Sequence, residues 1–370
     1  MTKVTVLMAV YNGASYLKKS AGSILSQAYS DFEFLIIDDG SIDDSVKILE
    51  SFKDKRIRIV KNNVNLGQTH SLNNGLKLAQ GQFIARIDCD DLAFPDWLKE
   101  QVKYLEGCQD AAVVSCTAVI IDMANRIQRL LKSSMTQQDA LLRSLTSTPI
   151  NHVGCMMQKD VMLQAGGYDE ALKVAADYEL WSRLLRAGAK ITSTQKPLVA
   201  IRVHPSSVSI QEKQRGTLFE IRDIIMRNFA ALARYPISQE DALLIAKIDY
   251  QPMSLASEDL TKVDGLLNEG FARLGANFQW PESRTKSHWK NLMKIMTVKC
   301  IFDSIEKKDF AKARRLCCDD MARHGKGSIV FVIYLFTFLG QGLTKQLPRW
   351  HQHWLQFKAR LKFPGRLQLG

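Results

Sequence analysis

The stretch Phe83-Ile84-Ala85-Arg86-Ile87, followed directly by Asp88-Cys89-Asp90-Asp91, decides the fold. A short apolar run of this kind predicts a buried strand over residues 83–87. Three carboxylates within four residues repel one another, and a divalent cation at the end of the strand would offset that repulsion. Mg²⁺ and Mn²⁺ prefer carboxylate and phosphate oxygens as ligands. The alternative interpretation is a solvated acidic turn that caps a helix beginning near Pro95.

Strands and helices alternate on the N-terminal side of this stretch. Such alternation predicts an α/β fold with a mostly parallel sheet and helices on both of its faces. In sheets of this kind, ligands bind beyond the carboxyl ends of the strands. The predicted strands cover residues 4–10, 32–37, 57–60 and 83–87, and the predicted helices cover residues 16–27, 46–52 and 72–79.

Polar clusters follow three of these strands at the point where each strand ends. They are Tyr11-Asn12, Asp38-Asp39 and Asp88–Asp91. Because the ends of parallel strands share one edge of a sheet, we expect the three clusters to lie together. Asp39 can accept a hydrogen bond from a base N–H or a ribose hydroxyl. The alternative for Asp38-Asp39-Gly40-Ser41 is an N-cap followed by a turn, since Asp-Gly and Ser favour turns.

The pattern changes after residue 210. Before it we predict a strand over 111–121, a turn over 161–170 and a helix over 177–186, then a strand over 197–203. After it the sequence shows only helical periodicity, so we predict a catalytic domain over 1–210 and a helical, basic region over 211–370. The helices expected in that region cover residues 216–234, 240–248, 289–306 and 308–323.

Three single residues are further candidates for the site. Asp177 precedes a helix, and it is either a carboxylate favoured by the helix dipole or a general base for a hydroxyl group. His204, after the last predicted strand, is either a metal ligand or a surface histidine. His152 could line an acceptor site, although a lone histidine is more often structural.

Composition and motifs exclude several classes of protein. The seven cysteines have no regular spacing, which argues against a disulfide framework or a zinc site. The sequence has no P-loop, no dinucleotide-binding glycine motif and no G-x-S-x-G motif. Met1-Thr2-Lys3 runs directly into the first strand without a signal-peptide pattern. We therefore expect a protein of the reducing cytoplasm.

The positive charge is concentrated at the C-terminus. Residues 281–370 contain 18 Lys and Arg against 6 Asp and Glu, which accounts for the whole net charge of +12. Such asymmetry indicates a membrane or nucleic-acid partner. No nucleic-acid-reading motif is present, so we expect peripheral association with the anionic inner face of the cytoplasmic membrane. Residues 329–339 are too short to span a bilayer and are either a core helix or an interfacial segment.

The motifs in this order resemble family 2 glycosyltransferases with the GT-A fold. The resemblance covers about residues 3–210, and the combination is specific although each piece alone is weak. It is carried by Val10-Tyr11-Asn12-Gly13, Ser23–Gln27, Asp31-Phe32-Glu33, Ile37–Ser41, Asn65-Leu66-Gly67, Ala85–Asp91, Gly166–Glu170, Asp177–Trp181 and Arg202–Ser206.

The resemblance implies a role for each candidate residue. Asp88 and Asp90 would form a D-x-D pair that binds Mn²⁺ or Mg²⁺, with Asp90 the direct ligand. Asp91 leaves this register open, because some relatives place the ligand one position later. Asp177 would be the catalytic base and His204 a metal or diphosphate contact. The residues implied for the nucleotide of a UDP-sugar donor are Tyr11, Asp39, Arg86, Asp88 and Asp91.

The expected activity is a single inverting displacement that moves one hexose or N-acetylhexosamine from a UDP-sugar. The expected acceptor is a glycan or lipid-linked glycan of bacterial polysaccharide or lipopolysaccharide biosynthesis. The sequence departs from some relatives at Ala176, where Glu is common, and it lacks the Q-x-x-R-W motif of processive synthases. One sugar per encounter is therefore expected. A catalytically inactive nucleotide-sugar-binding protein is the competing hypothesis, against which the intact acidic residues argue.

Overall fold

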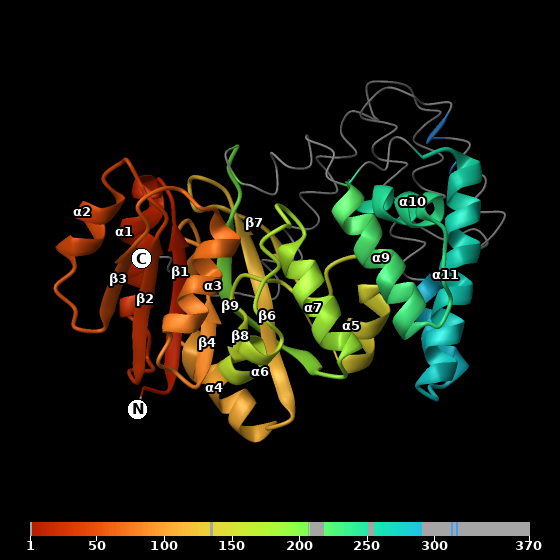
Figure 1. Cartoon of the computed structure of the whole chain (residues 1–370), viewed down its shortest axis with the longest axis horizontal. Coiled ribbons are helices and arrows are strands. Elements are labelled where there is room, and N and C mark those ends of the chain that lie inside the picture. Colours follow the sequence, from red (N-terminus) through yellow and green to blue (C-terminus); the bar gives the residue numbers. More distant parts are fainter. Residues whose placement is uncertain are drawn as a thin grey trace. The chain divides into compact units, whose positions relative to one another are not determined.

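The computed structural model describes residues 2–133, 136–205, 207, 218–250, 255–290, 312–313 and 316 (Figure 1). These residues form two compact units. The first unit contains the residues up to Leu141 and those described from Thr148 to 207. The second unit contains Leu142–Ser147 and the residues described from 218 onward. The predicted border between residues 210 and 211 lies outside the described residues.

Four neighbouring parallel strands form one half of the sheet in the first unit. β1 pairs with β2 on one side and with β4 on the other, and β2 pairs with β3. Each strand is an apolar run near a predicted position, and β1 and β2 are almost fully buried because helices cover both faces. The bounds are β1 Val4–Val10, β2 Phe32–Asp38, β3 Ile57–Lys61 and β4 Phe83–Arg86.

The other half of the sheet is mixed. The described residues form a nine-stranded sheet. Eight of its strands are hydrogen-bonded in the order β3-β2-β1-β4-β8-β6-β9-β5, and β7 pairs with β6. β8 is antiparallel to β4 and β6, whereas β6 and β9 are parallel. The predicted α/β fold is thus confirmed, with antiparallel pairs added. The bounds are β5 Leu92–Ala93, β6 Ala111–Ile121, β7 Ile127–Leu131, β8 Met156–Gln158 and β9 Lys190–Arg202.

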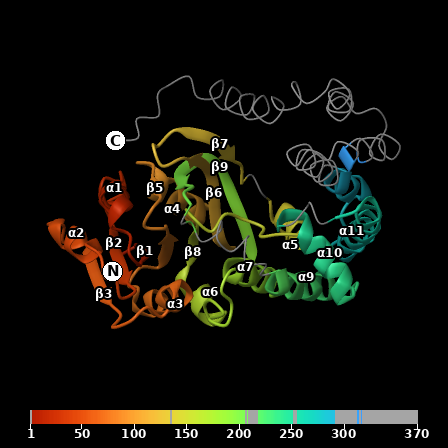
Figure 2. The same ribbon diagram turned by 90° about the horizontal axis from the view of Figure 1, so that it is seen from above.

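Helices cover both faces of this sheet, with α1 and α4 on one face and α3, α6 and α7 on the other (Figure 2). On the first face, Leu17 of α1 and Trp97 of α4 belong to the same buried cluster as Val6 of β1. On the opposite face, Gly75 of α3 lies against Leu7, where a Cβ would come within 2.2 Å of the leucine side chain. The helices of this unit are α1 Ala14–Leu25, α2 Ser45–Ser51, α3 Gln68–Leu78, α4 Trp97–Gly107, α6 Lys159–Gln164 and α7 Ala176–Arg186, and α5 Gln137–Ser144 continues into the second unit.

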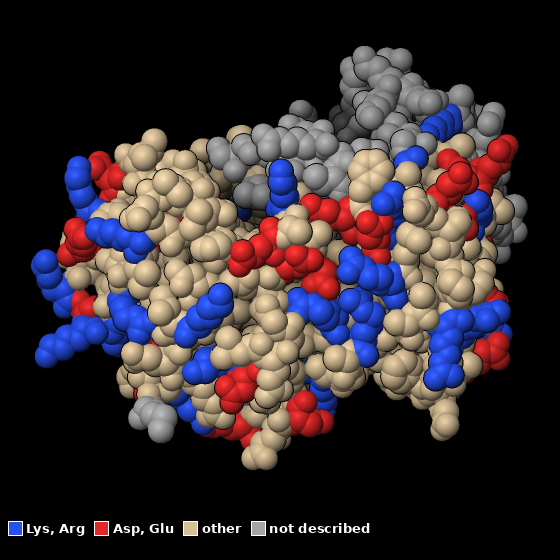
Figure 3. Space-filling view, viewed as in Figure 1, with Lys and Arg blue, Asp and Glu red and all other residues tan. Residues whose placement is uncertain are grey.

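Lysine side chains gather at the edge of the sheet formed by β3 and α2 (Figure 3). The exposed lysines there are Lys47, Lys53, Lys55 and Lys61. Charged side chains on an edge strand oppose pairing with a second chain. Of these lysines, Lys61 lies on β3 itself, and we assign it to protection of the edge.

The second unit is helical where it is described. α9 (Leu218–Leu232), α10 (Gln239–Tyr250) and α11 (Ser257–Asn277) bury apolar side chains that include Phe229 and Phe271. Two side-chain amides close helix ends: Asn228 donates to Ser144 O at 2.6 Å, and Asn277 donates to Leu232 O at 3.0 Å. No helix in the described part of the chain has the length and apolar character needed to cross a bilayer.

Several sequence predictions need correction or stay untested. The turn predicted from residue 161 is wrong at its start, because 159–164 form α6, in which Met162 is buried. β9 begins at Lys190 rather than at 197, since its first half is polar and half-exposed and gives no apolar signal. α11 was not predicted. Residues 329–339 and nearly all of the helices predicted over 289–306 and 308–323 lie outside the described residues.

Candidate active site

The acidic cluster lies between the end of β4 and the short strand β5. One carboxylate oxygen from each of Asp88, Asp90 and Asp91 lies within 4.8 Å of the others. Asp91 is buried, and Asp88 and Asp90 are half-buried. The sequence grouped Asp88, Asp90 and His204 as metal residues, whereas the structure groups the three aspartates.

Asp88 is held by two donors. Its Oδ1 accepts hydrogen bonds from Gln68 Nε2 at 2.9 Å and from the guanidinium of Arg86. Arg86 is buried, and its Nε has no hydrogen-bond partner among the described residues. Burial raises the pKa of Asp88, a rise that nearby Asp90 adds to and Arg86 opposes. A basic side chain with an unused donor thus stands beside the acidic cluster.

Asp90 contacts the residues that follow β9. Its Oδ2 lies 2.9 Å from His204 Nε2, and its carbonyl oxygen accepts from Arg202 Nε at 2.9 Å. Tyr16 of α1 contacts both partners of Asp90. Its ring stacks on the His204 ring with the two centroids 5.1 Å apart, and Arg202 Cζ lies 5.0 Å from the centroid of the Tyr16 ring. The predicted proximity of His204 to the cluster is observed. Its predicted role as a metal ligand stays a prediction.

Asp91 is tied to β9 through the main chain. Its Oδ1 accepts from Arg202 N at 2.7 Å, across 111 positions of sequence. Burial raises the pKa of Asp91 well above its usual range, and the charges of Asp90 and Asp88 raise it further. Ionising a carboxyl group here is therefore costly unless a positive charge compensates it.

The donor set fits a hard divalent cation. All three groups supply oxygen, which is the ligand that Mg²⁺ and Mn²⁺ prefer. A cation would also offset the burial and the mutual repulsion that raise the pKa values of Asp88 and Asp91. Asp90 belongs to both possible pairs of the cluster, 88/90 and 90/91.

The loop after β1 lies against the acidic cluster and against the loop after β2. A Cβ on Gly13 would come within 2.9 Å of Cys89 Sγ. Asn12 donates from its backbone to Ser41 Oγ at 3.0 Å, and its side chain accepts from Ile42 N at 2.9 Å. These contacts join the three polar clusters that were predicted to share one edge of the sheet. Tyr11 in this loop is 47% exposed, so its ring is accessible to a ligand.

Asp39 is a buried anchor for the loop between β3 and α3. Its two carboxylate oxygens accept from Asn62 Nδ2 at 2.8 Å, Leu66 N at 3.0 Å and Gly67 N at 2.8 Å. Three donors leave room for about one more at a carboxylate. The contact of Asp39 with a nucleotide base stays a prediction. Holding the loop is a second role of Asp39, which was not predicted.

Asp39→Ala is expected to lower the free energy of unfolding by about 2–3 kcal/mol, because charge-assisted hydrogen bonds are lost and backbone donors lose their partner. Urea denaturation measures the change. Asp44→Ala is the matched control, since among the described residues the Asp44 side chain forms only an exposed ion pair with Lys47. Equal effects of the two substitutions would contradict the anchoring role of Asp39.

Asp177 lies in the first turn of α7. Its Oδ1 accepts from Tyr178 N at 2.7 Å. Burial raises the pKa of Asp177, while this hydrogen bond and the charge of Arg86 oppose the rise and the charge of Asp88 adds to it. The charges of Arg86 and Asp88 thus act on the pKa of Asp177, and its place in the candidate site stays a prediction.

His152 lies in a buried aromatic cluster on the same side. Its Nε2 is 2.8 Å from the hydroxyl of Tyr168, and its ring meets Trp181 of α7 edge-on at 5.8 Å. Burial lowers the pKa of His152 well below its usual value, and the charge of Arg86 lowers it further. His152 is therefore a neutral hydrogen-bonding group at physiological pH. Its predicted acceptor contact stays a prediction.

Sequence reasoning did not single out Gln68 or Arg202. Gln68 lies at the start of α3 and reaches Asp88 across 20 positions, and Arg202 holds both Asp90 and Asp91. The position of Arg202 two residues before His204 was the available signal. Gln68 gave none, because its neighbours in the sequence are polar and belong to a long loop.

The comparisons with known proteins identify the family of the chain. Residues 5–166 match the family described as glycosyl transferase family 2. A protein of Haemophilus influenzae, named an uncharacterized glycosyltransferase, is 31% identical over 217 residues, which are 56% of this chain and 67% of the relative. The chain belongs to glycosyltransferase family 2, and it is a glycosyltransferase.

Solved structures share the fold. S. aureus TarS 1-349, crystallised in complex with UDP-GlcNAc, has a TM-score of 0.54 at 14% identity and covers 88% of this chain and 93% of its own. The mannosyltransferase PcManGT of Pyrobaculum calidifontis, in complex with GDP-Man and Mn²⁺, has a TM-score of 0.50 at 19% identity and covers 81% of this chain and 87% of its own. At these identities the likeness shows the fold alone.

Proposed function

We propose that this glycosyltransferase moves one hexose or N-acetylhexosamine from a UDP-sugar to a hydroxyl of a glycan acceptor, with inversion at the anomeric carbon. The observation that carries the proposal is the acidic cluster of Asp88, Asp90 and Asp91, with the half-buried carboxylate of Asp177 as a second acidic group. The two are 86 positions apart between Asp91 and Asp177, and Asp177 interacts electrostatically with Asp88. Two sets of carboxylates at one site suit a leaving group on one side and a proton acceptor on the other.

The donor side is built from the ends of β1, β2 and β4. The exposed ring of Tyr11 can flank a base, and Asp39 has room for one further donor beside its three loop contacts. The unpaired Nε of Arg86 can donate to an anionic oxygen of the diphosphate. On this fold, TarS binds UDP-GlcNAc and PcManGT binds GDP-Man. The choice of nucleotide is therefore set by local contacts rather than by the fold.

A divalent cation fits at the acidic cluster, with Asp90 as the central ligand and Asp88 and Asp91 beside it. When bound, Mn²⁺ or Mg²⁺ would neutralise charge on the diphosphate leaving group. His204 contacts the Asp90 carboxylate and is proposed to orient it or to join it on the metal or diphosphate. The cluster as a whole therefore serves the leaving group.

The acceptor side is assigned to α7. The acceptor oxygen attacks the anomeric carbon, its proton passes to the Asp177 carboxylate, and the bond from the anomeric carbon to the diphosphate oxygen breaks. Attack opposite to the leaving group in one displacement inverts the anomeric configuration. The raised pKa that burial gives Asp177 makes it a stronger base than a solvated aspartate. A glycan or lipid-linked glycan of bacterial polysaccharide synthesis would supply the hydroxyl.

A thermal-shift screen tests the donor assignment. UDP-GlcNAc, UDP-Glc, GDP-Man and dTDP-Glc are compared with and without Mn²⁺, and a UDP-sugar with Mn²⁺ is expected to raise the melting temperature most, because ligands that bind the folded state stabilise it. Release of UDP from that sugar then separates an enzyme from an inactive binder. Stabilisation by GDP-Man alone would refute the UDP assignment, and binding without UDP release would refute catalysis.

A further inference from the structure

Helix α3 contacts both sides of the candidate site. At its start, Gln68 Nε2 donates to Asp88 Oδ1 of the acidic cluster at 2.9 Å. Further along the helix, Asn73 contacts Tyr168 and Glu170, in the loop formed by Ala165–Glu170. One rigid element therefore joins the leaving-group side to the chain segment that leads into α7.

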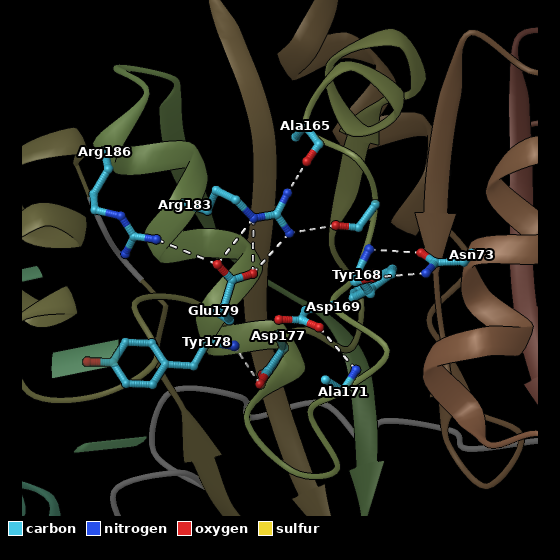
Figure 4. A network of polar contacts seen from close by, with 11 residues as sticks. Asn73, Ala165, Tyr168, Asp169, Ala171, Asp177, Tyr178, Glu179, Arg183 and Arg186 are labelled. Carbon is cyan, nitrogen blue, oxygen red and sulfur yellow. Dashed lines mark hydrogen bonds and ion pairs between the residues drawn. The ribbon is translucent and has the colours of Figure 1, made fainter. Parts of the chain in front are cut away.

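Asn73 uses its whole amide group on this loop (Figure 4). Its Oδ1 accepts from Tyr168 N at 2.8 Å, and its Nδ2 donates to Tyr168 O at 2.9 Å. Its Nδ2 also donates to Glu170 Oε1 at 2.8 Å. Gly167 permits this approach, because its φ is 70° and a Cβ there would come within 2.5 Å of Asn73 Oδ1. Asn73 is buried, with 8% of its surface exposed, so its two bonds to the main chain of buried Tyr168 are made away from water, whereas Glu170 is exposed.

α7 holds the same loop from its other side. Arg183 donates to the carbonyl oxygens of Ala165 and Gly167, the latter at 2.6 Å, while its Nη2 pairs with Glu179 at 2.9 Å (Figure 4). Arg186 also pairs with Glu179, at 3.5 Å. Glu179 is only 3% exposed, so this ion pair is shielded from solvent. The loop Ala165–Glu170 is thus fixed between α3 and α7.

The fixed loop places Tyr168, whose surroundings include the proposed base. The Tyr168 hydroxyl lies 2.8 Å from His152 Nε2, and His152 packs against Trp181 of α7. Tyr168 also interacts electrostatically with Asp177. A shift of this loop would therefore move the packing of the helix turn that carries Asp177.

We propose that Asn73 is a positioning residue, which through the loop Ala165–Glu170 sets the place of Asp177 relative to the acidic cluster. The inference rests on the proposed role of Asp177 as the general base. Asn73 touches none of the residues assigned to the donor, so its loss should spare donor binding. Small displacements of a reacting group can slow a reaction by about 100-fold, because attack needs close alignment of the reacting atoms.

Asn73→Ala is expected to lower kcat for release of UDP by about 10- to 100-fold. The assay uses UDP-GlcNAc, or whichever of the four screened nucleotide sugars stabilises most, with Mn²⁺ and water as the acceptor. The Kd and the binding stoichiometry of UDP with Mn²⁺ are expected to stay within about 3-fold of the wild type, because the Gln68–Asp88 contact remains. A purely structural role would instead lower the stoichiometry and the rate together.

Asn74→Ala is the matched control. Asn74 is the next residue of α3, is half-buried and makes no side-chain hydrogen bond within the described part of the chain. The isosteric Asn73→Asp keeps the acceptor for Tyr168 N but loses both donor bonds, so it tests the contact even where the alanine variant does not fold. It is expected to lower kcat in the same way as Asn73→Ala.

The outcomes separate this inference from the proposed function. No UDP release by the wild type, or full activity of Asp177→Asn, would overturn the proposed function and this inference with it. Wild-type UDP release that Asp177→Asn removes, together with an unchanged kcat in both Asn73 variants, would overturn the positioning role alone. A loss of UDP binding that parallels the loss of kcat would also overturn it.

Discussion

Asp177→Asn is expected to lower kcat for sugar transfer and for UDP release by about 100- to 10,000-fold, the usual contribution of a general base. Asparagine has the shape of aspartate and keeps an oxygen for the hydrogen bond from Tyr178 N, but it cannot take up the acceptor proton. Donor binding with Mn²⁺ is expected to persist. Steady-state kinetics and calorimetric titration of UDP measure the two effects separately.

The pH profile and a matched variant complete this test. Because burial raises the pKa of Asp177, the wild-type rate should be lost as pH falls through that raised value, where the base becomes protonated. The residual rate of Asp177→Asn should lack this acidic limb. Asp160→Asn is the control, since Asp160 also lies in the first turn of a helix but is exposed. Near-normal activity of Asp177→Asn would refute the base assignment.

Asp90→Ala is expected to weaken Mn²⁺-dependent binding of UDP by at least about 100-fold, because a hard cation loses an anionic oxygen ligand. Asp90 is the informative position, since it belongs to both readings of the D-x-D register. Titration of UDP with Mn²⁺ and again with EDTA isolates the metal-dependent part of the affinity. The metal-free affinity should be similar in the variant and the wild type.

Asp96→Ala is the control for the loss of an acidic side chain. Asp96 stands before α4, is exposed and makes no capping hydrogen bond with its side chain. We expect its Mn²⁺ dependence to match the wild type. An unchanged Mn²⁺ dependence in Asp90→Ala would remove the metal site from the proposal and leave Asp90 as a partner of His204.

Buried regular strands were predictable from the sequence, and short or half-exposed ones were not. β1 and β6 occupy the predicted residues, because each is a largely apolar run between polar turns. β5 and β8 have two and three residues, too few for any periodicity to show. The pairing of β8 with both β4 and β6 depends on partners far along the chain.

The candidate site was predictable in its carboxylates but not in their partners. Parallel strand order alone brings Asp39 and Asp88 to one edge of the sheet. Which groups bind them depends on loop conformation, as with Leu66 N and Gly67 N on Asp39. The contacts of Asn73 span 95 and 97 positions, and no local pattern in the sequence encodes such a pair.

The pairing of β5 with β9 bears on the order in which the chain assembles. Leu92 pairs with Ala200, and Arg202 supplies the main-chain donor for Asp91. Closing so long a loop costs entropy before its contacts form, so these bonds are expected late in folding. During synthesis the ribosome releases the acidic cluster well before β9 exists. A nascent chain therefore carries the complete acidic cluster without the bonds that give it shape, and affinity for the proposed cation should arise only once β9 is present.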